Sequence, residues 1–319
     1  MFEIINPGLE VTVQDYPGRL GYWSVGIPPS GPMDPVAFRI ANRLVENAEG
    51  APGLEIAGLG PTIKFHDDAR IAITGAKFKA KLDDAEIDWY TPVDVKAGSV
   101  LKMGSISGGG FRAYIAFAGG IDVPEYLGSY STFPHGHFGG FEGRKLLKGD
   151  MVKVKKQTNP IKARTNLGIT FKPDYPSHWE IGVIPGPHES PDFFTEAFTK
   201  TFYSTDYKVS YNANRLGIRL DGPIPEFSRK DGGEGGKHPS NMHDYTYAIG
   251  TINFSGNTPI IITADGPSLG GFISYATLPT AELWKAGQIK PGDSIRFIKM
   301  THGEALQKQK DMETLISML

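Results

Sequence analysis

The sequence has no cysteine among its 319 residues. Without thiols the chain can form no disulfide, no thiolate nucleophile and no cysteine-ligated zinc site. A cysteine-free chain is typical of the reducing cytoplasm, so we expect a cytoplasmic protein. The opening residues Met1-Phe2-Glu3-Ile4 also lack the basic start and apolar core of a signal peptide.

Neither sign of charge dominates, and no long apolar run is present. The chain has 33 Lys and Arg residues against 35 Asp and Glu residues, for a formal net charge of -2. This balance gives no electrostatic reason to expect nucleic acid or an anionic membrane as a partner. No apolar run approaches the roughly 20 residues of a transmembrane helix. We therefore expect neither a nucleic-acid partner nor a membrane partner.

Several motifs with a known chemistry are missing as well. The sequence contains no Gly-x-x-x-x-Gly-Lys-Ser/Thr phosphate loop and no Gly-x-Gly-x-x-Gly after an expected strand. His-x-x-x-His spacing for zinc is absent. The single close histidine pair, His135 and His137, has no nearby acidic partner and is interpreted as part of a turn. We expect no metal site.

Glycine and proline, in contrast, are abundant, with 40 and 24 residues. Pro-Gly, Gly-Pro and Gly-Gly steps recur along the chain and mark tight turns between short apolar runs. The runs include residues 71–73, 113–117 and 259–262, and their β-branched or aromatic content favours strands. The predicted fold class is mainly β with a few short helices.

The first and second halves share an order of features. In each half a helix start, a Leu-x-Ile-x-x-x-Gly-Pro segment, a phenylalanine four residues later and a Gly-Asp turn follow one another. Coincidence is the alternative, because such turns are common, but four landmarks in one order favour a duplication. The paired landmarks are Asp34-Pro35 and Ser190-Pro191, residues 54–61 and 216–223, Phe65 and Phe227, and Gly149-Asp150 and Gly292-Asp293.

The duplication predicts two related β-barrel-like units, residues 1–155 and 156–300, with a proline-containing link near residues 155–178. A tail at residues 301–319 is expected to form an amphipathic helix that packs on the body or on a partner. The residues expected to form buried helical stripes are Phe38, Ala41, Leu44 and Val45 in the first half, Phe194, Ala197 and Phe198 in the second half, and Leu306, Met312, Leu315 and Leu319 in the tail.

Two glycine-rich loops of the first half hold polar side chains. Residues 26–34 include Ser30 and end at the expected helix start, where backbone amides attract anions or carbonyl oxygens. A simple capped entry turn fits this loop equally well. Residues 128–144 end at Arg144, whose guanidinium is suited to bind a carboxylate of a ligand or to form a surface ion pair.

The densest polar cluster lies in the second half, at residues 231–244. A stretch without apolar anchors is normally a solvated loop. However, Asn241, His243 and Asp244 together offer a carboxamide, an imidazole and a carboxylate, which suit a small neutral amide and the movement of a proton. The companion loop, residues 265–272, offers backbone N–H groups of the kind that stabilise an oxyanion.

These loops carry a resemblance to a known family. The chain resembles the allophanate hydrolase subunit 2 family, which includes the first half of the carboxyltransferase domain of urea carboxylase and the C subunit of bacterial 5-oxoprolinase. The match extends from about residue 5 to about residue 300. Its motifs in this sequence are Thr12-Val13-Gln14-Asp15, residues 25–34, Ala118-Gly119-Gly120, Leu127-Gly128-Ser129, Ser131-Thr132-Phe133, Pro185-Gly186-Pro187-His188, Asn214-Arg215-Leu216-Gly217, His238-Pro239-Ser240-Asn241 and residues 265–271.

The resemblance implies a pair of cyclophilin-like β-barrels and a partner of the subunit 1 type. It also implies a biotin carboxylase and a biotin carrier domain made elsewhere, since this chain has no Met-Lys-Met biotinylation site. The expected activity is transfer of CO2 from carboxybiotin to an amide nitrogen such as that of urea. Tyr130 stands where the family usually has a basic residue, and Arg144 is a candidate to replace that charge.

The candidate catalytic residues are His243, as a proton carrier, and Asp244. Two alternatives remain: the C subunit of an ATP-dependent 5-oxoprolinase, and a non-catalytic regulatory subunit. The candidate substrate-binding residues are Ser240, Asn241, Gly266, Ser268, Gly270, Gly271, Arg144 and Ser30.

Overall fold

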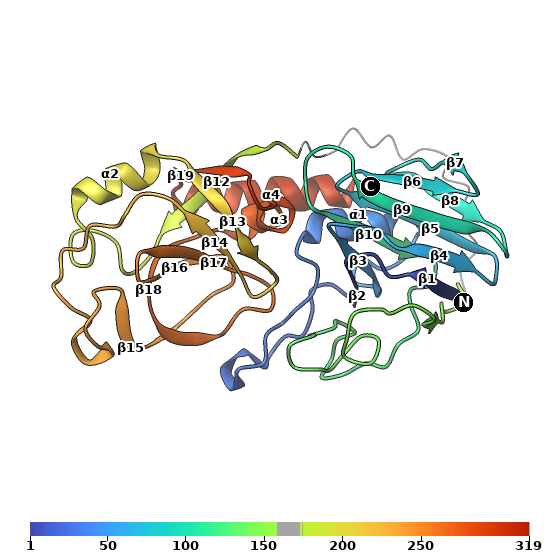
Figure 1. The fold of residues 1–319 in the computed structure, drawn as a ribbon, viewed down its shortest axis with the longest axis horizontal. Coiled ribbons are helices and arrows are strands. Elements are labelled where there is room, and N and C mark those ends of the chain that lie inside the picture. Colours follow the sequence, from blue (N-terminus) through green and yellow to red (C-terminus); the bar gives the residue numbers. More distant parts are fainter. Residues whose placement is uncertain (158–172, 174, 319) are drawn as a thin grey trace. The chain divides into compact units, whose positions relative to one another are not determined.

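The computed structural model describes residues 1–157, 173 and 175–318 (Figure 1). These residues form two compact units. The first comprises the described parts of Met1–Leu20, Pro29–Tyr175 and Leu315–Leu319, and the second comprises Gly21–Pro28 and Pro176–Thr314. The expected link near residues 155–178 and Leu319 of the expected tail lie largely outside the described residues. The boundaries drawn from the sequence, after residues 155 and 300, stay a prediction.

The first unit contains two antiparallel sheets and one helix. One sheet has the strand order β11-β1-β4-β9-β6-β7, and the other has the order β2-β3-β10-β5-β8. The bounds are β1 Phe2–Asn6, β2 Glu10–Gln14, α1 Pro35–Leu44, β3 Gly53–Ala57, β4 Thr62–Phe65, β5 Ala69–Gly75, β6 Phe78–Leu82, β7 Ala85–Glu86, β8 Pro92–Val95, β9 Val100–Ile106, β10 Arg112–Phe117 and β11 Met151–Val152.

Alternating apolar residues of both sheets form one buried core in this unit. Phe2 of β1 stacks on Phe117 of β10, with ring centroids 4.7 Å apart, so the core joins the two sheets. Helix α1 lies against β10 and β5 (Figure 1). Its start agrees with the sequence prediction, because the Asp34 carboxylate accepts the Ala37 N–H at 2.9 Å and Pro35 occupies the first turn. The predicted stripe of this helix is buried.

The second unit is built on one sheet with the order β12-β19-β13-β14-β17-β16-β18-β15, in which β12 and β19 are parallel. Strand β12 also pairs with β18 over two residues. The bounds are η1 Trp23–Val25, β12 His178–Pro185, α2 Glu196–Ser204, β13 Tyr207–Ala213, β14 Gly217–Asp221, η2 Gly233–Gly235, β15 Asn241–Thr246, β16 Thr251–Ser255, β17 Thr258–Ile262, β18 Leu269–Thr277, η3 Thr280–Glu282, α3 Leu283–Gln288, β19 Ser294–Lys299 and α4 His302–Ser317.

Two helix predictions for the second half need correction. Helix α2 begins at Glu196 rather than after Ser190-Pro191, because the Thr195 hydroxyl caps it by accepting the Phe198 N–H at 3.1 Å. Phe194 therefore precedes the helix and packs among other aromatic rings, and Ala197 is exposed. The terminal helix α4 is present, but Leu306 is 49% exposed, and the buried apolar residues of this helix are Ala305 and Ile316.

The mainly β class with a few helices is confirmed. The three predicted apolar runs lie in β5, β10 and β17. The two Gly-Asp turns lead into β11 and β19, as the repeated pattern predicts. Within the described residues no helix combines the length and the apolar character needed to span a bilayer. A closed barrel is not established for either unit and stays a prediction.

Candidate functional site

Two predicted site segments of the second unit lie side by side as paired strands. Strand β15 runs antiparallel to β18, with Asn241 opposite Phe272, Tyr245 opposite Gly270 and Thr246 opposite Leu269. The register shifts between Asn241 and Tyr245, so extra residues of β15 bulge at this point. The structure thus brings the segment containing Asn241, His243 and Asp244 next to the segment containing Gly270 and Gly271.

The conformation of the first segment differs from the expected loop. Residues 241–246 form a strand because β18 supplies partners for the backbone, a long-range effect that the polar sequence does not announce. The Asn241 side chain is half-buried, whereas His243 and Asp244 are exposed. Successive side chains of a regular strand point to opposite faces, so His243 and Asp244 can share a face only because of the bulge between Asn241 and Tyr245. The joint action of the imidazole and the carboxylate therefore stays a prediction.

Ser240 acts as an anchor of this segment. Its side chain is fully buried, and its hydroxyl lies 2.9 Å from His238 Nδ1. The same oxygen accepts the Gly256 N–H at 3.0 Å, and the Ser240 carbonyl accepts the Ile273 N–H at 3.0 Å. Because these bonds tie the start of β15 to β18 and to the turn at Gly256, Ser240 positions Asn241.

The companion turn is fixed by a buried ion pair. Arg215 donates to both carboxylate oxygens of Asp265, from Nε at 2.7 Å and from Nη2 at 3.0 Å. The two side chains are only 5% and 3% exposed. The Gly266 N–H donates to Thr263 O at 2.8 Å, so this predicted oxyanion donor is used within the turn.

Ser268 and Gly270 of the companion segment contact Tyr247, whereas Gly271 faces the Met242 carbonyl. The Tyr247 N–H donates to Ser268 O at 2.8 Å, and the Tyr247 hydroxyl accepts the Phe272 N–H at 2.8 Å. A Cβ on Gly270 would lie 2.8 Å from that hydroxyl oxygen, so a side chain at this position would displace the Tyr247 ring. The spacing of Gly266, Ser268 and Gly270 also matches a Gly-x-Ser-x-Gly elbow, but Ser268 leads into a strand rather than a helix.

His188 was not selected from the sequence as a site residue, yet it lies beside β15. It is 4% exposed, and its Nδ1 accepts the Ser274 N–H of β18 at 2.9 Å. This bond assigns the proton of the neutral ring to Nε2. The ring contacts Phe193 and Tyr245, with centroids 4.6 and 4.4 Å away. His188 thus presents a fixed N–H donor next to the candidate strand.

Arg229 supports the same region through the backbone of the strand. Its Nε donates to Pro239 O at 2.6 Å, its Nη2 donates to Asn241 O, and its guanidinium lies 4.9 Å from the centre of the Phe193 ring. Burial lowers the pKa of Arg229. Burial, together with the positive charge of Arg229, also lowers the pKa of His188 below its ordinary value of 6.5. His188 is therefore neutral at neutral pH.

This pKa shift predicts a pH dependence of stability. Because the pKa of His188 is lower in the folded chain than in the unfolded chain, the unfolded chain takes up the proton first as the pH falls. His188 therefore costs stability below about pH 6.5 and costs none above it. His188→Asn offers Ser274 an acceptor that does not titrate, so urea unfolding should show a smaller loss of stability between about pH 7 and about pH 5 than in the original chain. An equal loss in both proteins would contradict this assignment.

The two candidates of the first unit have different surroundings. Ser30 is 5% exposed with a φ of 56°, and its hydroxyl has no hydrogen-bond partner among the described residues. The Arg19 N–H donates to Pro29 O at 2.7 Å, which holds this loop against the chain around Gly18. Close by in sequence, the Asp15 carboxylate accepts hydrogen bonds of 2.5 Å from the hydroxyls of Ser129 and Ser131.

Arg144 forms the ion pair that was the simpler interpretation of the sequence. Its guanidinium donates to Asp150 at 2.7 and 3.0 Å and to Glu142 at 2.6 Å. Both carboxylates raise its pKa. A second cation lies beside Tyr130, because Lys155 Nζ is 4.9 Å from the centre of that ring. Lys155 rather than Arg144 thus places a positive charge at the Tyr130 position.

Comparison with known proteins defines the class of this two-unit β chain. A family model described as "Carboxyltransferase domain, subdomain A and B" matches residues 25–299. The chain belongs to this carboxyltransferase domain family.

The relatives include proteins of two named types. The urea amidolyase of Lachancea kluyveri is 49% identical over 330 residues, a match that covers 100% of this chain and 18% of the relative. The C subunit of the Escherichia coli 5-oxoprolinase is 33% identical over 324 residues, covering 100% of this chain and 97% of the relative. The crystal structure of the K. lactis urea amidolyase has a TM-score of 0.95 at 47% identity, covering 99% of this chain and 20% of that chain.

The chain therefore spans about a fifth of the length of the urea amidolyases that it matches. Within the described residues there is no group of three or more His, Asp or Glu side chains arranged to hold a metal ion.

Proposed function

We propose that this chain is the part of a biotin-dependent carboxyltransferase that helps to place CO2 on an amide nitrogen such as that of urea. The observation that carries the proposal is the match along the whole chain to a urea amidolyase, at 47% identity and a TM-score of 0.95. A partner of the subunit 1 type, a biotin carboxylase and a biotin carrier domain would complete the enzyme. A cytoplasmic location and a cyclophilin-like barrel in each unit belong to the proposal; the β12–β18 pairing supports the barrel in the second unit.

The donors beside β15 fit the ureido group of biotin and the amide of an acceptor. Carboxybiotin, when bound, would supply the carboxyl group. Among the described residues the Asn241 amide has a single contact, from the Ser240 hydroxyl at 3.5 Å, so its N–H and C=O groups remain suited to a ligand. His188 offers an N–H at Nε2. These groups match a ureido ring, which has both a carbonyl acceptor and N–H donors.

Each residue of this region has a distinct role in the proposal. Asn241 and Asp244 bind the N–H groups of the acceptor amide, and His243 moves the proton that leaves the acceptor nitrogen when the N–C bond forms. Backbone donors of the Ser268–Gly271 segment and His188 stabilise the negative charge that develops on the ureido oxygen. Arg229 and Ser240 hold Asn241 in place. Ser30 and Arg144 are kept as weaker candidates for ligand binding.

One specific observation favours a second candidate function. The chain matches 97% of the length of the C subunit of the E. coli 5-oxoprolinase, whereas it matches only 18% of the urea amidolyase of L. kluyveri. The C subunit of an ATP-dependent 5-oxoprolinase is therefore the alternative, and a non-catalytic regulatory subunit is a third candidate without a supporting observation.

Reconstitution tests the proposal. The chain is mixed with its subunit 1 partner, biotin carboxylase and a biotinylated carrier, and ATP use is measured with urea, guanidine or 5-oxoproline as acceptor. We expect ATP use that requires urea or a related amide, bicarbonate and the biotinylated carrier. A carrier that lacks biotin is the control. ATP use with 5-oxoproline that does not need the carrier would replace the proposal by the oxoprolinase alternative.

A further inference from the structure

In the six-stranded sheet of the first unit, the edge strand β7 pairs with only part of its neighbour β6. Strand β7 has two residues, and it pairs with β6 only at Lys81 and Leu82. In the described residues the other side of β6 is covered by β9, so Phe78–Ala80 has no partner strand at its outer edge. Backbone groups alternate in direction along a strand, so those of Phe78 and Ala80 point to the same side as those of Leu82. An added strand could bind there.

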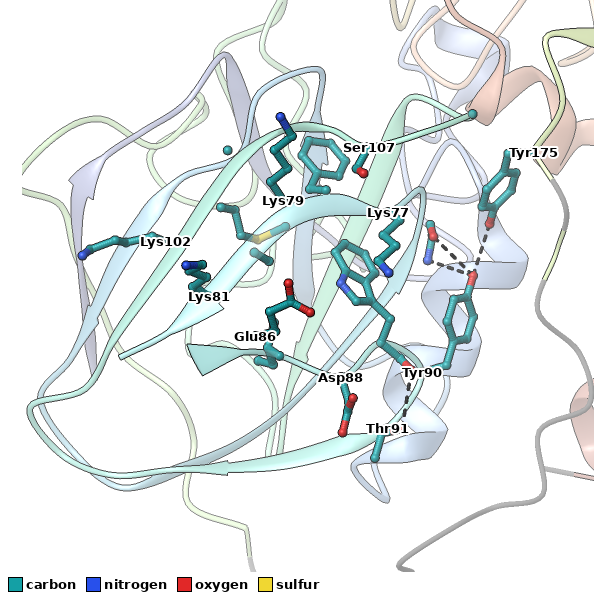
Figure 2. Close-up of a pocket in the computed structure, with 18 of the residues that line it drawn as sticks. Lys77, Lys79, Lys81, Glu86, Asp88, Tyr90, Thr91, Lys102, Ser107 and Tyr175 are labelled. Atoms are coloured by element: carbon teal, nitrogen blue, oxygen red, sulfur yellow. Dashed lines mark hydrogen bonds between the residues drawn. The ribbon is translucent and has the colours of Figure 1, made fainter. Parts of the chain in front are cut away.

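A groove runs along this outer edge of β6 (Figure 2). Its volume is about 1210 Å³, and its opposite side is formed by the segment from Glu86 to Thr91. Figure 2 shows Lys79 and Lys81 of β6 and Lys102 of β9 on one side of the groove and Glu86, Asp88 and Thr91 on the other. Small-molecule pockets usually measure about 300–1,000 Å³, so the groove fits an extended polypeptide better than a small ligand.

Lysines line the sheet side of the groove. Lys77, Lys79 and Lys81 stand at alternate positions and therefore share one face, and Lys102 lies opposite Lys81 in β9. Lys102 pairs with Asp84 at 3.1 Å, but the three lysines at alternate positions form no ion pair with any described residue. Four lysines face two carboxylates, Glu86 and Asp88, so the lining is positive on balance and most positive along β6.

The other face of β6 is apolar. Phe78 and Ala80 alternate with the lysines, and Trp89 stacks on Phe78 with ring centroids 6.5 Å apart and an interplanar angle of 13°. Trp89 is half-buried and lines the groove. A strand added beside Phe78–Ala80 would place every second side chain near the lysines and the others near these apolar groups.

We propose that this groove binds an extended acidic segment of a partner polypeptide, which adds as a strand to the outer edge of β6. The segment would alternate acidic with apolar residues, the acidic ones on the lysine side. Lysines on an edge strand also protect against unwanted pairing. Protection against unwanted strand pairing, however, requires neither a groove of this size nor the Phe78 and Trp89 rings beside the unpaired edge. The proposal concerns the first unit only and does not depend on the proposed carboxyltransferase function.

A labelled peptide tests this binding. The probe is a capped peptide of about ten residues that alternates Glu and Val, carries fluorescein and is followed by fluorescence anisotropy. The control peptide has the same composition with all Glu residues in one block. We expect the alternating peptide to bind at least about tenfold more tightly than the block peptide. Equal affinity for both would overturn the proposal, since simple charge attraction does not depend on the order of residues.

Charge reversal in the protein tests the lysines. Lys79→Glu with Lys81→Glu should weaken binding of the alternating peptide at least about tenfold. The matched control, Lys148→Glu with Lys153→Glu, changes the net charge equally at exposed positions outside the groove lining and should leave binding unchanged. Melting temperatures of both variants verify folding. An equal loss of peptide affinity in the two variants would show that net charge alone determines binding, and would overturn the proposed site.

Backbone methylation separates an added strand from a surface contact. Two versions of the peptide carry N-methyl groups at alternate residues, one at odd positions and one at even positions. An added strand uses the N–H groups of one parity only, so one version should bind at least about tenfold more weakly and the other should bind normally. Equal binding of both versions would exclude strand addition to β6.

Discussion

Asp265→Ala is expected to lower the free energy of unfolding of the second unit by about 3–5 kcal/mol. Asp265 accepts two hydrogen bonds from Arg215, and both side chains are at least nine-tenths buried. Removal of the carboxylate takes away the bidentate partner of the buried guanidinium, and Asp265 then no longer offsets the cost of burying that charge. Urea unfolding followed by circular dichroism and tryptophan fluorescence measures the change.

A second Arg–Asp pair of the same unit provides the matched control. Arg296 Nε donates to Asp206 at 2.7 Å, the same distance as in the buried pair, but the two side chains are 33% and 42% exposed. Water competes for an exposed pair, so Asp206→Ala should cost less than about 1 kcal/mol. Similar costs for Asp265→Ala and Asp206→Ala would show that burial does not determine the contribution of these pairs.

The buried pair also explains why two of the sequence motifs occur together. Arg215 belongs to the Asn214–Gly217 motif and Asp265 to the 265–271 motif, fifty positions apart. The Thr263 hydroxyl donates to Arg215 O at 2.6 Å, and the Asp265 N–H donates to the same oxygen at 2.8 Å. The turn that precedes β18 is thus tied to Arg215 through both backbone and side chain. The 214–217 and 265–271 motifs are therefore adjacent in the structure, and the bonds between them stabilise the fold.

Local signals in the sequence predicted the first helix correctly and the second incorrectly. At Asp34-Pro35 the capping carboxylate and the proline act on adjacent residues, so the sequence alone contains the determinants. At Ser190-Pro191 the same type of signal is overruled, because Phe194 is drawn into an aromatic cluster with Phe254 and Tyr275. Burial of large rings outweighs a capping preference of about 1 kcal/mol.

The candidate site could be predicted only in part for the same reason. The sequence predicts that the 238–244 and 265–271 segments act together. The structure places parts of both segments side by side in β15 and β18, and their joint action stays a prediction. His188 belongs to the Pro185–His188 motif but was not selected as a site residue, because its partner, Ser274, lies 86 residues away and the motif does not show this contact. The hydrogen bond from the Gly266 N–H to Thr263 O could likewise not be predicted, since the sequence shows a backbone donor but not its acceptor.

Alanine at Asn241 or at Asp244 is expected to lower urea-dependent turnover of the reconstituted enzyme at least about 100-fold, which corresponds to about 2.7 kcal/mol of transition-state stabilisation. In the proposal both side chains bind the acceptor amide directly, and the loss of such positioned hydrogen bonds acts on the reaction rather than on the fold. Asp244 is exposed, and within the described part of the chain the Asn241 side chain has a single hydrogen-bond contact, at 3.5 Å from Ser240, so both variants should unfold at the same urea concentration as the original chain.

Thr246→Ala is the control for these variants, because Thr246 is an exposed polar residue of the same strand that has no assigned role. Its turnover should match that of the original chain. Carboxylation of the biotinylated carrier without acceptor, measured with labelled bicarbonate, should stay the same in all three variants, which separates a defect in acceptor binding from a defect in carboxyl supply. Near-normal rates for both Asn241→Ala and Asp244→Ala with all partners present would remove these residues from the site. The search for acceptor-binding groups would then move to His188 Nε2, the fixed donor next to the strand.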